Sequence, residues 1–442
     1  MKRATNSGMR TSRRGRTVLA TVIAGSLVLA ACGGGGDGDS TDTSETGTGS
    51  SAAPDSTALP STEVDEYGGP PTGAEMIVGL INTEGTPGLD FPNIRRFIEA
   101  AVEWTNENGG FGNRPVKLET CVVKGSPETS QACAQELVGK NVELVLLGFD
   151  LFPDYKTFDA AKLPVIGVLP ILAPDYTANA LFLTGGNATS QAAIAAVAKE
   201  KFAAASVSIV HSDNAGANST AASLEAALDK AGITWTAVKG GDNETDAGYQ
   251  GLMREAAQSD PDVIISLYAD AGCIGTMRGR ASLGITIPVI TTAACADKSV
   301  IDVVGDDALG WMFAGLAPEA DTPDRKLQKQ LLAPVVGVEP DELTVASLGL
   351  SGLGYLLYMS LVDYANQMNA DGLEVTGQGI FDYLKASDGL YLFGSQSPIE
   401  CGSEPKYPAV CSYVFPFAEY KGGGVIGPVD GLELVNSKPY LP

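Results

Sequence analysis

The sequence predicts an α/β fold with two domains, each built on a parallel sheet. Short aliphatic runs alternate with longer amphipathic runs, as in proteins whose parallel strands are covered by helices on both faces. This alternation starts near residue 76 and restarts after residue 186, so two sheets are expected. About 370 residues follow a polar N-terminal segment, which is more than one hydrophobic core usually supports.

The first set of elements opens with an aliphatic strand at 76–81. Residues 91–108 carry apolar side chains at helical spacing, and the helix should end at Gly109 because glycine often caps a helix C-terminus. Ser126 and Pro127 predict another helix start, with serine as N-cap and proline in the first turn. Further aliphatic strands are expected at 116–122, 142–147 and 164–168.

The second set repeats the alternation and is followed by a mostly helical block at 323–386. A tail at 412–420 alternates as a strand does, with a turn at Gly422–Gly424. The helices expected in the second set are 190–202, 220–231, 247–258 and one ending at 284, and the strands are 207–210, 233–238, 263–267 and 287–291.

The N-terminus predicts export. Residues 1–31 contain no acid, begin with basic residues and continue as an apolar run ending in Leu-Ala-Ala before Cys32, which are features of a signal peptide. The run is short for a bilayer span, which needs about 20 apolar residues. Leu-Ala-Ala-Cys resembles the bacterial lipobox, so we expect Cys32 to be acylated and to anchor the protein to the cell membrane. The alternatives are an ordinary signal peptide with an unrelated cysteine, or a twin-arginine signal using the arginines at 13 and 14.

A tether is expected at 32–73. From residue 33 to residue 72 the chain is rich in Gly, Ser, Thr, Asp and Pro and has no Lys or Arg, so it buries too little apolar surface to fold. The whole chain carries a net charge of −24, and removal of the six basic residues of the signal leaves about −30. No basic patch is evident, which argues against a nucleic-acid partner.

Seven cysteines occur. Six remain after Cys32, and an even number in an exported protein suggests disulfides. Several pairings are possible, and the one we predict joins sequence neighbours and closes three short loops. A metal site is disfavoured because no C-x-x-C occurs and His211 is the only histidine. The predicted pairs are Cys121 with Cys133, Cys273 with Cys295, and Cys401 with Cys411.

One segment resembles a known family. Asn106, Gly109, Gly110, Arg114 and Pro115 form the pattern N-x-x-G-G-x-x-x-R-P. This pattern resembles type I periplasmic binding proteins and, more narrowly, the branched-chain amino-acid (leucine/isoleucine/valine) binding family of ABC transporters. The likeness runs from about residue 75 to the C-terminus.

The resemblance implies two Rossmann-like lobes joined by a three-crossing hinge, with a small solute bound in the cleft at the carboxyl ends of the strands. It also implies a monomer outside the cytoplasm that delivers this solute to ABC permease and ATPase subunits. The expected lobes are 74–185 plus 317–390 and 186–316 plus 391–442, with crossings near 185–186, near 315–316 and within 387–411.

In amino-acid-binding relatives, the loops after the strands at 142–147 and 164–168 supply hydroxyls and backbone amides to the ligand carboxylate. Here both loops are apolar apart from Asp150. Either these residues pack the loops while backbone N–H groups alone hold the ligand, or the ligand is itself fairly apolar. The ligand contacts expected in the first lobe are Thr83, Phe149, Asp150, Leu151, Leu169, Pro170 and Ile171.

In the second lobe, Asn214 and Ala215 stand where relatives carry an aromatic lid, so the alanine removes that lid. We expect Tyr268 to supply an aromatic surface instead. Gly272 falls where relatives carry the carboxylate that pairs with the ligand ammonium, and Asp270 is the nearby acid expected to replace it. The alternative for Asp270 is an ordinary helix N-terminal aspartate, which the helix dipole favours.

The sequence contains no G-x-S-x-G, Walker or H-E-x-x-H motif, and its single histidine is expected to be structural. We therefore expect neither an enzyme nor a cofactor. The predicted function is a substrate-binding lipoprotein of an ABC importer that captures an amino acid or a related, fairly apolar solute. The alternative is a ligand-sensing receptor for a membrane signalling protein.

Overall fold

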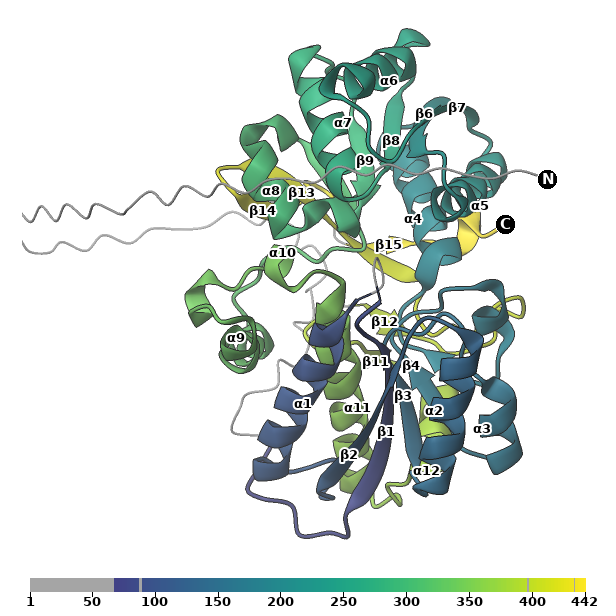
Figure 1. Ribbon diagram of the computed structural model, residues 1–442, viewed down its shortest axis with the longest axis vertical. Coiled ribbons are helices and arrows are strands. Elements are labelled where there is room, and N and C mark those ends of the chain that lie inside the picture. Colours follow the sequence, from purple (N-terminus) through teal and green to yellow (C-terminus); the bar gives the residue numbers. More distant parts are fainter. Residues whose placement is uncertain (1–66, 87–89, 396, 433) are drawn as a thin grey trace, which may run out of the picture. The chain divides into compact units, whose positions relative to one another are not determined.

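The computed structural model describes residues 67–86, 90–395, 397–432 and 434–442. In this part of the chain the strands form two large sheets, which confirms the predicted α/β fold (Figure 1). The predicted signal peptide, Cys32 and residues 33–66 of the predicted tether lie outside the described residues.

The first sheet has five parallel strands in the order β2-β1-β3-β4-β5. The central strand β3 is aliphatic and buried along its whole length, because helices cover both faces of a parallel sheet. The strands are β1 (Met76–Thr83), β2 (Val116–Val123), β3 (Leu144–Leu147), β4 (Val165–Gly167) and β5 (Leu181–Phe182).

The second sheet has eight strands and runs β14-β13-β10-β9-β8-β6-β7, with β15 paired to β13. Its strands β6 to β10 are parallel, whereas β13 is antiparallel to β10. The strands are β6 (Ser206–Ser212), β7 (Thr234–Gly240), β8 (Val263–Leu267), β9 (Val289–Thr292), β10 (Trp311–Ala314), β13 (Val414–Gly422), β14 (Val425–Pro428) and β15 (Leu434–Asn436).

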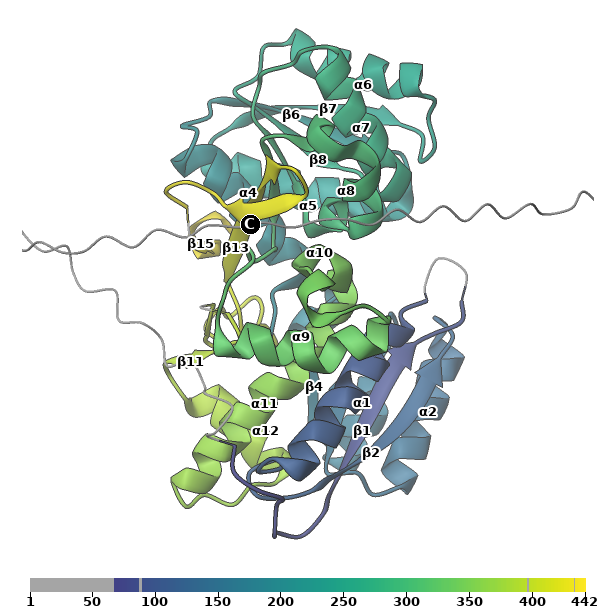
Figure 2. The ribbon, with the colours of Figure 1, turned by 90° about the vertical axis from the view of Figure 1, so that its left-hand side faces the viewer.

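Helices from two distant stretches of sequence pack with the first sheet, and α1 and α11 lie side by side (Figure 2). These helices are α1 (Pro92–Glu107), α2 (Pro127–Gly139), α3 (Tyr155–Ala161), α9 (Pro323–Val336), α10 (Val345–Leu348), α11 (Gly352–Ala370) and α12 (Gly377–Ala386). The helices around the second sheet are α4 (Gly186–Glu200), α5 (Ala215–Ala231), α6 (Asp246–Gln258), α7 (Asp270–Ser282) and α8 (Lys298–Val304).

The stretch Val345–Ala370 is long and apolar enough to cross a membrane by length and composition. More than half of its most apolar window is buried within the protein, 56%. Within α11, Leu357, Tyr358 and Leu361 are buried in the core of the first sheet. Core packing therefore accounts for the apolar character of this stretch.

The N-x-x-G-G-x-x-x-R-P motif is structural. Asn106 joins α1 to β2, since its amide donates to Val116 O (2.9 Å) and its carbonyl accepts from Val116 N (2.7 Å). Arg114 forms an ion pair with Glu143 at 2.6 Å, next to the start of β3. The motif thus holds α1, β2 and the start of β3 together.

The folded part begins before residue 74, because Tyr67 is buried. Its ring lies edge-on to Trp104, with centroids 5.0 Å apart, and its hydroxyl donates to Asp363. Gly109 of the motif has a φ of +78°, and a Cβ on it would lie 1.9 Å from Tyr67 O. Only glycine allows the backbone at Tyr67 to approach this closely.

The chain passes three times between the two cores: after β5, after β10, and after β12 (Pro398–Ile399), which pairs with β11 (Leu390–Tyr391). Leu390, Leu392 and Ile399 pack in the first core, whereas Tyr413 packs in the second. We therefore place the third crossing between Ile399 and Tyr413, which overlaps the range 387–411 expected from sequence and moves the lobe limit later than residue 390.

Candidate ligand-binding site

The loops after β1, β3 and β4 lie at the carboxyl edge of the first sheet, where parallel α/β sheets bind ligands. Thr83 ends β1 and is fully buried. Its hydroxyl donates to Phe149 O (2.7 Å), and its N–H donates to the same oxygen (2.8 Å). Thr83 therefore holds the loop after β3 in place, and its hydroxyl is already engaged.

Phe149 itself is half-buried. Its ring lies 4.5 Å from the ring of Phe91, and its N–H donates to Asn82 Oδ1 (3.1 Å). Leu151, two residues further on, is also half-buried. This loop thus presents two apolar side chains on a fixed backbone.

Asp150 points inward. It is only 3% exposed, and its Oδ1 accepts from the Ser130 hydroxyl (2.7 Å) and from Phe152 N (3.0 Å). Among the described residues Oδ2 has no hydrogen-bond partner. Burial raises the pKa of Asp150, against the lowering effect of these hydrogen bonds. The expectation that Asp150 faces the ligand stays a prediction; in this structure one of its two carboxylate oxygens bonds to α2 and to its own loop.

The loop after β4 is fixed by a residue that the sequence did not single out. Asp175, in the 3-10 helix η2 (Ala173–Thr177), accepts through Oδ2 from the N–H groups of Ile171 (2.7 Å) and Leu172 (2.8 Å). Its Oδ1 accepts from the Tyr155 hydroxyl (2.7 Å). Two backbone N–H groups of this loop, which were expected to be available to a ligand, therefore already donate within the protein. Within this loop Leu169 and Ile171 are half-buried, and Pro170 is buried.

In the second sheet, Asn214 is the N-cap of α5, because its Oδ1 accepts from Ala217 N (2.8 Å). Its amide donates to Asp242 (2.6 Å) and to the Ser212 hydroxyl (2.8 Å). Ala215 is exposed and opens the helix. As expected from the sequence, no aromatic side chain stands at residue 215, and the residues beside it, Asp213 and Asp242, are acidic.

Tyr268 follows β8 and is buried, with its ring edge-on to that of Tyr249 at 5.6 Å. Burial raises its pKa. A Cβ on Gly272 would lie 2.1 Å from the Tyr268 ring, so no side chain fits at residue 272. The carboxylate that relatives carry there is thus excluded sterically. Asp270 is exposed at the start of α7 and has a φ of +45°.

The three predicted disulfides are confirmed: Cys121–Cys133, Cys273–Cys295 and Cys401–Cys411. The bridge Cys273–Cys295 joins the first turn of α7 to the 3-10 helix η3 (Ala293–Ala296). These elements follow β8 and β9. The bridge therefore braces the carboxyl edge of the second sheet.

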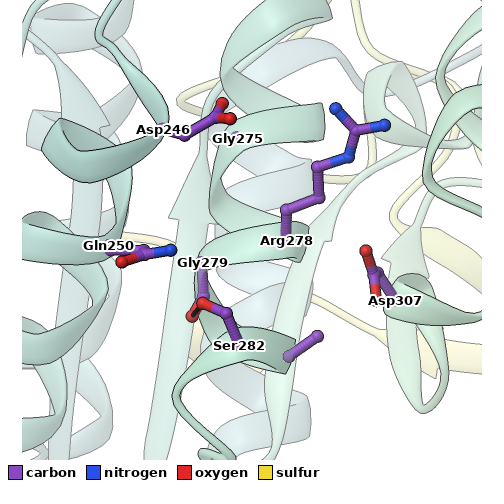
Figure 3. A pocket seen from close by; sticks show the side chains of 8 residues that line it. Asp246, Gln250, Gly275, Arg278, Gly279, Ser282 and Asp307 are labelled. Carbon is purple, nitrogen blue, oxygen red and sulfur yellow. Dashed lines mark hydrogen bonds between the residues drawn. The ribbon is translucent and has the colours of Figure 1, made fainter.

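Two of the hollows among the described residues lie away from these loops. The first, of about 310 Å³, lies between α6, α7 and the 3-10 helix η4 (Gly305–Ala308), with polar side chains around it (Figure 3). It is lined by Asp246, Gln250, Gly275, Arg278, Gly279, Ala281, Ser282 and Asp307. The second, of about 460 Å³, is lined by Asp297 and Lys298 from the second sheet's side and by Val336, Val338, Glu342, Ala346 and Ser347 near α9 and α10. The sequence predicted neither hollow.

No group of three or more His, Cys, Asp or Glu within the described ranges is arranged to hold a metal ion. His211 is buried in β6, where its Nδ1 lies 2.9 Å from Ser212 O.

The sequence matches the family model for periplasmic binding proteins over residues 77–359, more than half of the chain. The chain belongs to the periplasmic binding protein family. This confirms the resemblance drawn from the motif and places the chain among binding proteins rather than enzymes. No curated protein matches the sequence.

Solved structures share the fold. An ABC transporter substrate-binding protein from Sphaerobacter thermophilus has a TM-score of 0.64 and 19% identity, covering 82% of this chain and 98% of its own. A solute-binding protein from Rhodopseudomonas palustris HaA2, in complex with p-hydroxybenzoic acid, has a TM-score of 0.59 and 18% identity, covering 82% and 97%. The leucine-binding protein LivK from Thermotoga maritima has a TM-score of 0.57 and 14% identity, covering 82% and 99%.

Proposed function

We propose that the protein is the extracytoplasmic substrate-binding lipoprotein of an ABC importer and captures a small, fairly apolar solute between its two lobes. Membership of the periplasmic binding protein family, over residues 77–359, carries this proposal. Similar structures described as ABC transporter substrate-binding proteins support it. The permease and ATPase subunits of the importer would be its partners, and it would act as a monomer.

The loops at the edge of the first sheet favour an apolar ligand body. Phe149, Leu151, Leu169 and Ile171 are half-buried there, and covering apolar surface contributes about 25 cal/mol per Å². The nearby hydroxyl of Thr83 and the N–H of Ile171 are engaged within the protein. Similar proteins bind p-hydroxybenzoic acid or leucine. We therefore propose aromatic or branched-chain amino acids, or aromatic carboxylic acids, as the ligand class.

A thermal-shift screen tests this ligand class. The panel is leucine, phenylalanine, benzoate and 4-hydroxybenzoate, with succinate as a small polar dicarboxylate for comparison. A ligand at 100 times its dissociation constant stabilises the folded state by about 2.7 kcal/mol, which raises the melting temperature. Stabilisation by succinate alone would show that the proposed class is wrong.

Asp270 distinguishes amino acids from simple carboxylic acids. It makes no side-chain hydrogen bond or ion pair among the described residues and is exposed, so it is available to a ligand ammonium. Asp270→Asn should weaken the binding of an amino acid by about 1 kcal/mol or more and leave benzoate binding unchanged. Asp260→Asn is the matched control, because Asp260 is also exposed and has a φ of +49°. Equal affinities in both variants would exclude Asp270 from the site.

The anchor is tested separately. Cys32→Ala should release the protein into the medium or leave an uncleaved precursor, as judged by detergent partitioning and by the mass of the mature chain. Unchanged partitioning into the detergent phase would count against acylation of Cys32.

A further inference from the structure

We propose that η2 couples the candidate ligand loop at 169–172 to the crossings between the lobes, with Asp175 as the positioning residue on the loop side and Tyr176 as the contact on the crossing side. This inference rests on the proposed function insofar as the loop contacts a ligand. The coupling itself is a property of the protein without ligand.

On the loop side, one carboxylate fastens two segments. Asp175 is 2% exposed and accepts from two consecutive N–H groups of the loop after β4, at Ile171 and Leu172. It also accepts from Tyr155, the first residue of α3, which follows the loop after β3. Hydrogen bonds to a charged acceptor are stronger than neutral ones. A shift of Asp175 therefore moves both candidate ligand loops.

On the crossing side, the next residue reaches the second core. Tyr176 is 9% exposed, and its ring lies 5.5 Å from that of Tyr407, edge-on. Its hydroxyl accepts from Ala188 N (3.1 Å) in the first turn of α4, just past the first crossing. Its carbonyl accepts from Ala409 N (3.2 Å), in the segment of the third crossing.

The first crossing also passes close to this element. A Cβ on Gly186 would lie 2.3 Å from Pro170 O and 2.9 Å from the Tyr176 hydroxyl. The φ of Gly186 is +64°, a conformation that other residues rarely adopt, and there is also no room for a Cβ. Both reasons require glycine at this position. The loop, η2 and the start of α4 thus form one continuous packed unit.

Asp175 therefore bonds to the ligand loop while the adjacent Tyr176 bonds to the crossings, and both lie on the same short 3-10 turn. Because a 3-10 turn is compact and both side chains are buried, Asp175 cannot shift without moving Tyr176. A ligand that favours one arrangement of loop 169–172 must then favour one arrangement of the crossings, and the effect is reciprocal.

Amide hydrogen exchange on the ligand-free protein tests the link in both directions. Tyr155→Phe removes only the hydroxyl that donates to Asp175, and Tyr176→Phe removes only the hydroxyl that accepts from Ala188. Tyr383→Phe is the control, since its hydroxyl bonds to Gln367 between α11 and α12. Asp175→Asn is a stronger variant of the same volume.

In Tyr155→Phe, amide exchange should be at least about threefold faster at Ile171 and Leu172 and also at Ala188. Amides that belong to one cooperative unit open in the same event, so their exchange rates rise together. In Tyr176→Phe, exchange should rise at Ala188 and also at Ile171 and Leu172. The control should change none of these amides. The coupling is overturned if Tyr155→Phe speeds exchange only at Ile171 and Leu172 and Tyr176→Phe speeds exchange only at Ala188.

Leucine and 4-hydroxybenzoate are then added as probes. A probe that binds should slow exchange at Ile171 and at Ala188 together in the unaltered protein. If neither probe binds, the proposed ligand class fails, while the ligand-free exchange result still decides the coupling.

Discussion

Two buried carboxylates lie beside the candidate ligand loops, at Asp150 and Asp175. Burial raises the pKa of each, and Asp175 raises the pKa of Asp150 further by its charge. Asp175 has three hydrogen-bond donors around it, whereas Oδ2 of Asp150 has no partner among the described residues. Asp150 is therefore the costlier of the two when ionised, since a buried polar atom without a partner destabilises the fold.

This predicts a pH-dependent effect of Asp150→Asn. Because the folded-state pKa of Asp150 is raised, the folded protein favours the neutral form, and stability falls as pH rises from about 4 through the raised value. Asparagine keeps the oxygen that accepts from Ser130 and Phe152 but never ionises. The variant should melt higher than the unaltered protein by about 2 °C or more near pH 7.5, and the difference should vanish near pH 4.

Melting curves across this pH range check the prediction, with Asp260→Asn as the exposed control. The prediction is contradicted if Asp150→Asn melts lower than the unaltered protein near pH 7.5. That result would mean that the Asp150 charge stabilises the loop.

At the scale of elements, α7 packs through its glycines. Gly272 faces the ring of Tyr268, while Gly275 and Gly279 face Tyr249 of α6. A Cβ on Gly275 would lie 2.0 Å from the Tyr249 ring. The close approach of α6 and α7 therefore depends on the absence of side chains along one face of α7.

Gly275→Ala should accordingly destabilise the protein by about 1–3 kcal/mol through overpacking, although alanine is the better helix former. Gly251→Ala in α6 is the matched control, since nothing lies within 4 Å of its added Cβ. The control should be neutral or stabilising by up to about 1 kcal/mol. Urea unfolding measures both, and equal effects in the two variants would contradict the packing account.

At the scale of the whole molecule, a disulfide lies in the third crossing. Cys401–Cys411 spans 10 residues, and Cys121–Cys133 spans 12 within the first sheet's layer of β2 and α2. Loops of similar length restrict the unfolded chain to a similar extent. Cys411 N also donates to Phe182 O (2.9 Å), which joins the third crossing to the end of β5.

Replacing either pair with serines should therefore cost a similar free energy of unfolding, about 2–4 kcal/mol. Only Cys401→Ser/Cys411→Ser should speed amide exchange at Phe182 and at Ala188, where the first and third crossings lie together. Faster exchange there in the Cys121→Ser/Cys133→Ser protein as well would show that the loss is global.

The sequence by itself determined the fold class, the second α/β set after residue 186, the disulfide pairing and the family. Each depends on local patterns: strand β8 at 263–267 and the end of α5 at Gly232 follow from hydrophobic runs and a glycine cap. The motif at 106–115 indicates the family, and the local backbone requires two of its residues: Gly109 and Gly110 have positive φ and no room for a Cβ.

Only the tertiary structure decided what the candidate site residues do. Thr83 ends β1 and Asp150 lies on the loop after β3, as expected, yet the Thr83 hydroxyl bonds to Phe149 O and Oδ1 of Asp150 accepts from Ser130 and Phe152. Asp175 stands three residues after Leu172, at the spacing of an acid that caps a helix start, so its bonds to Ile171 and Leu172 could have been predicted from sequence. Its bond to Tyr155 on α3 depends on how α3 packs, which the spacing does not record. The side-chain direction of a loop residue depends on packing against distant segments, whereas periodicity records only which face of a regular element is buried.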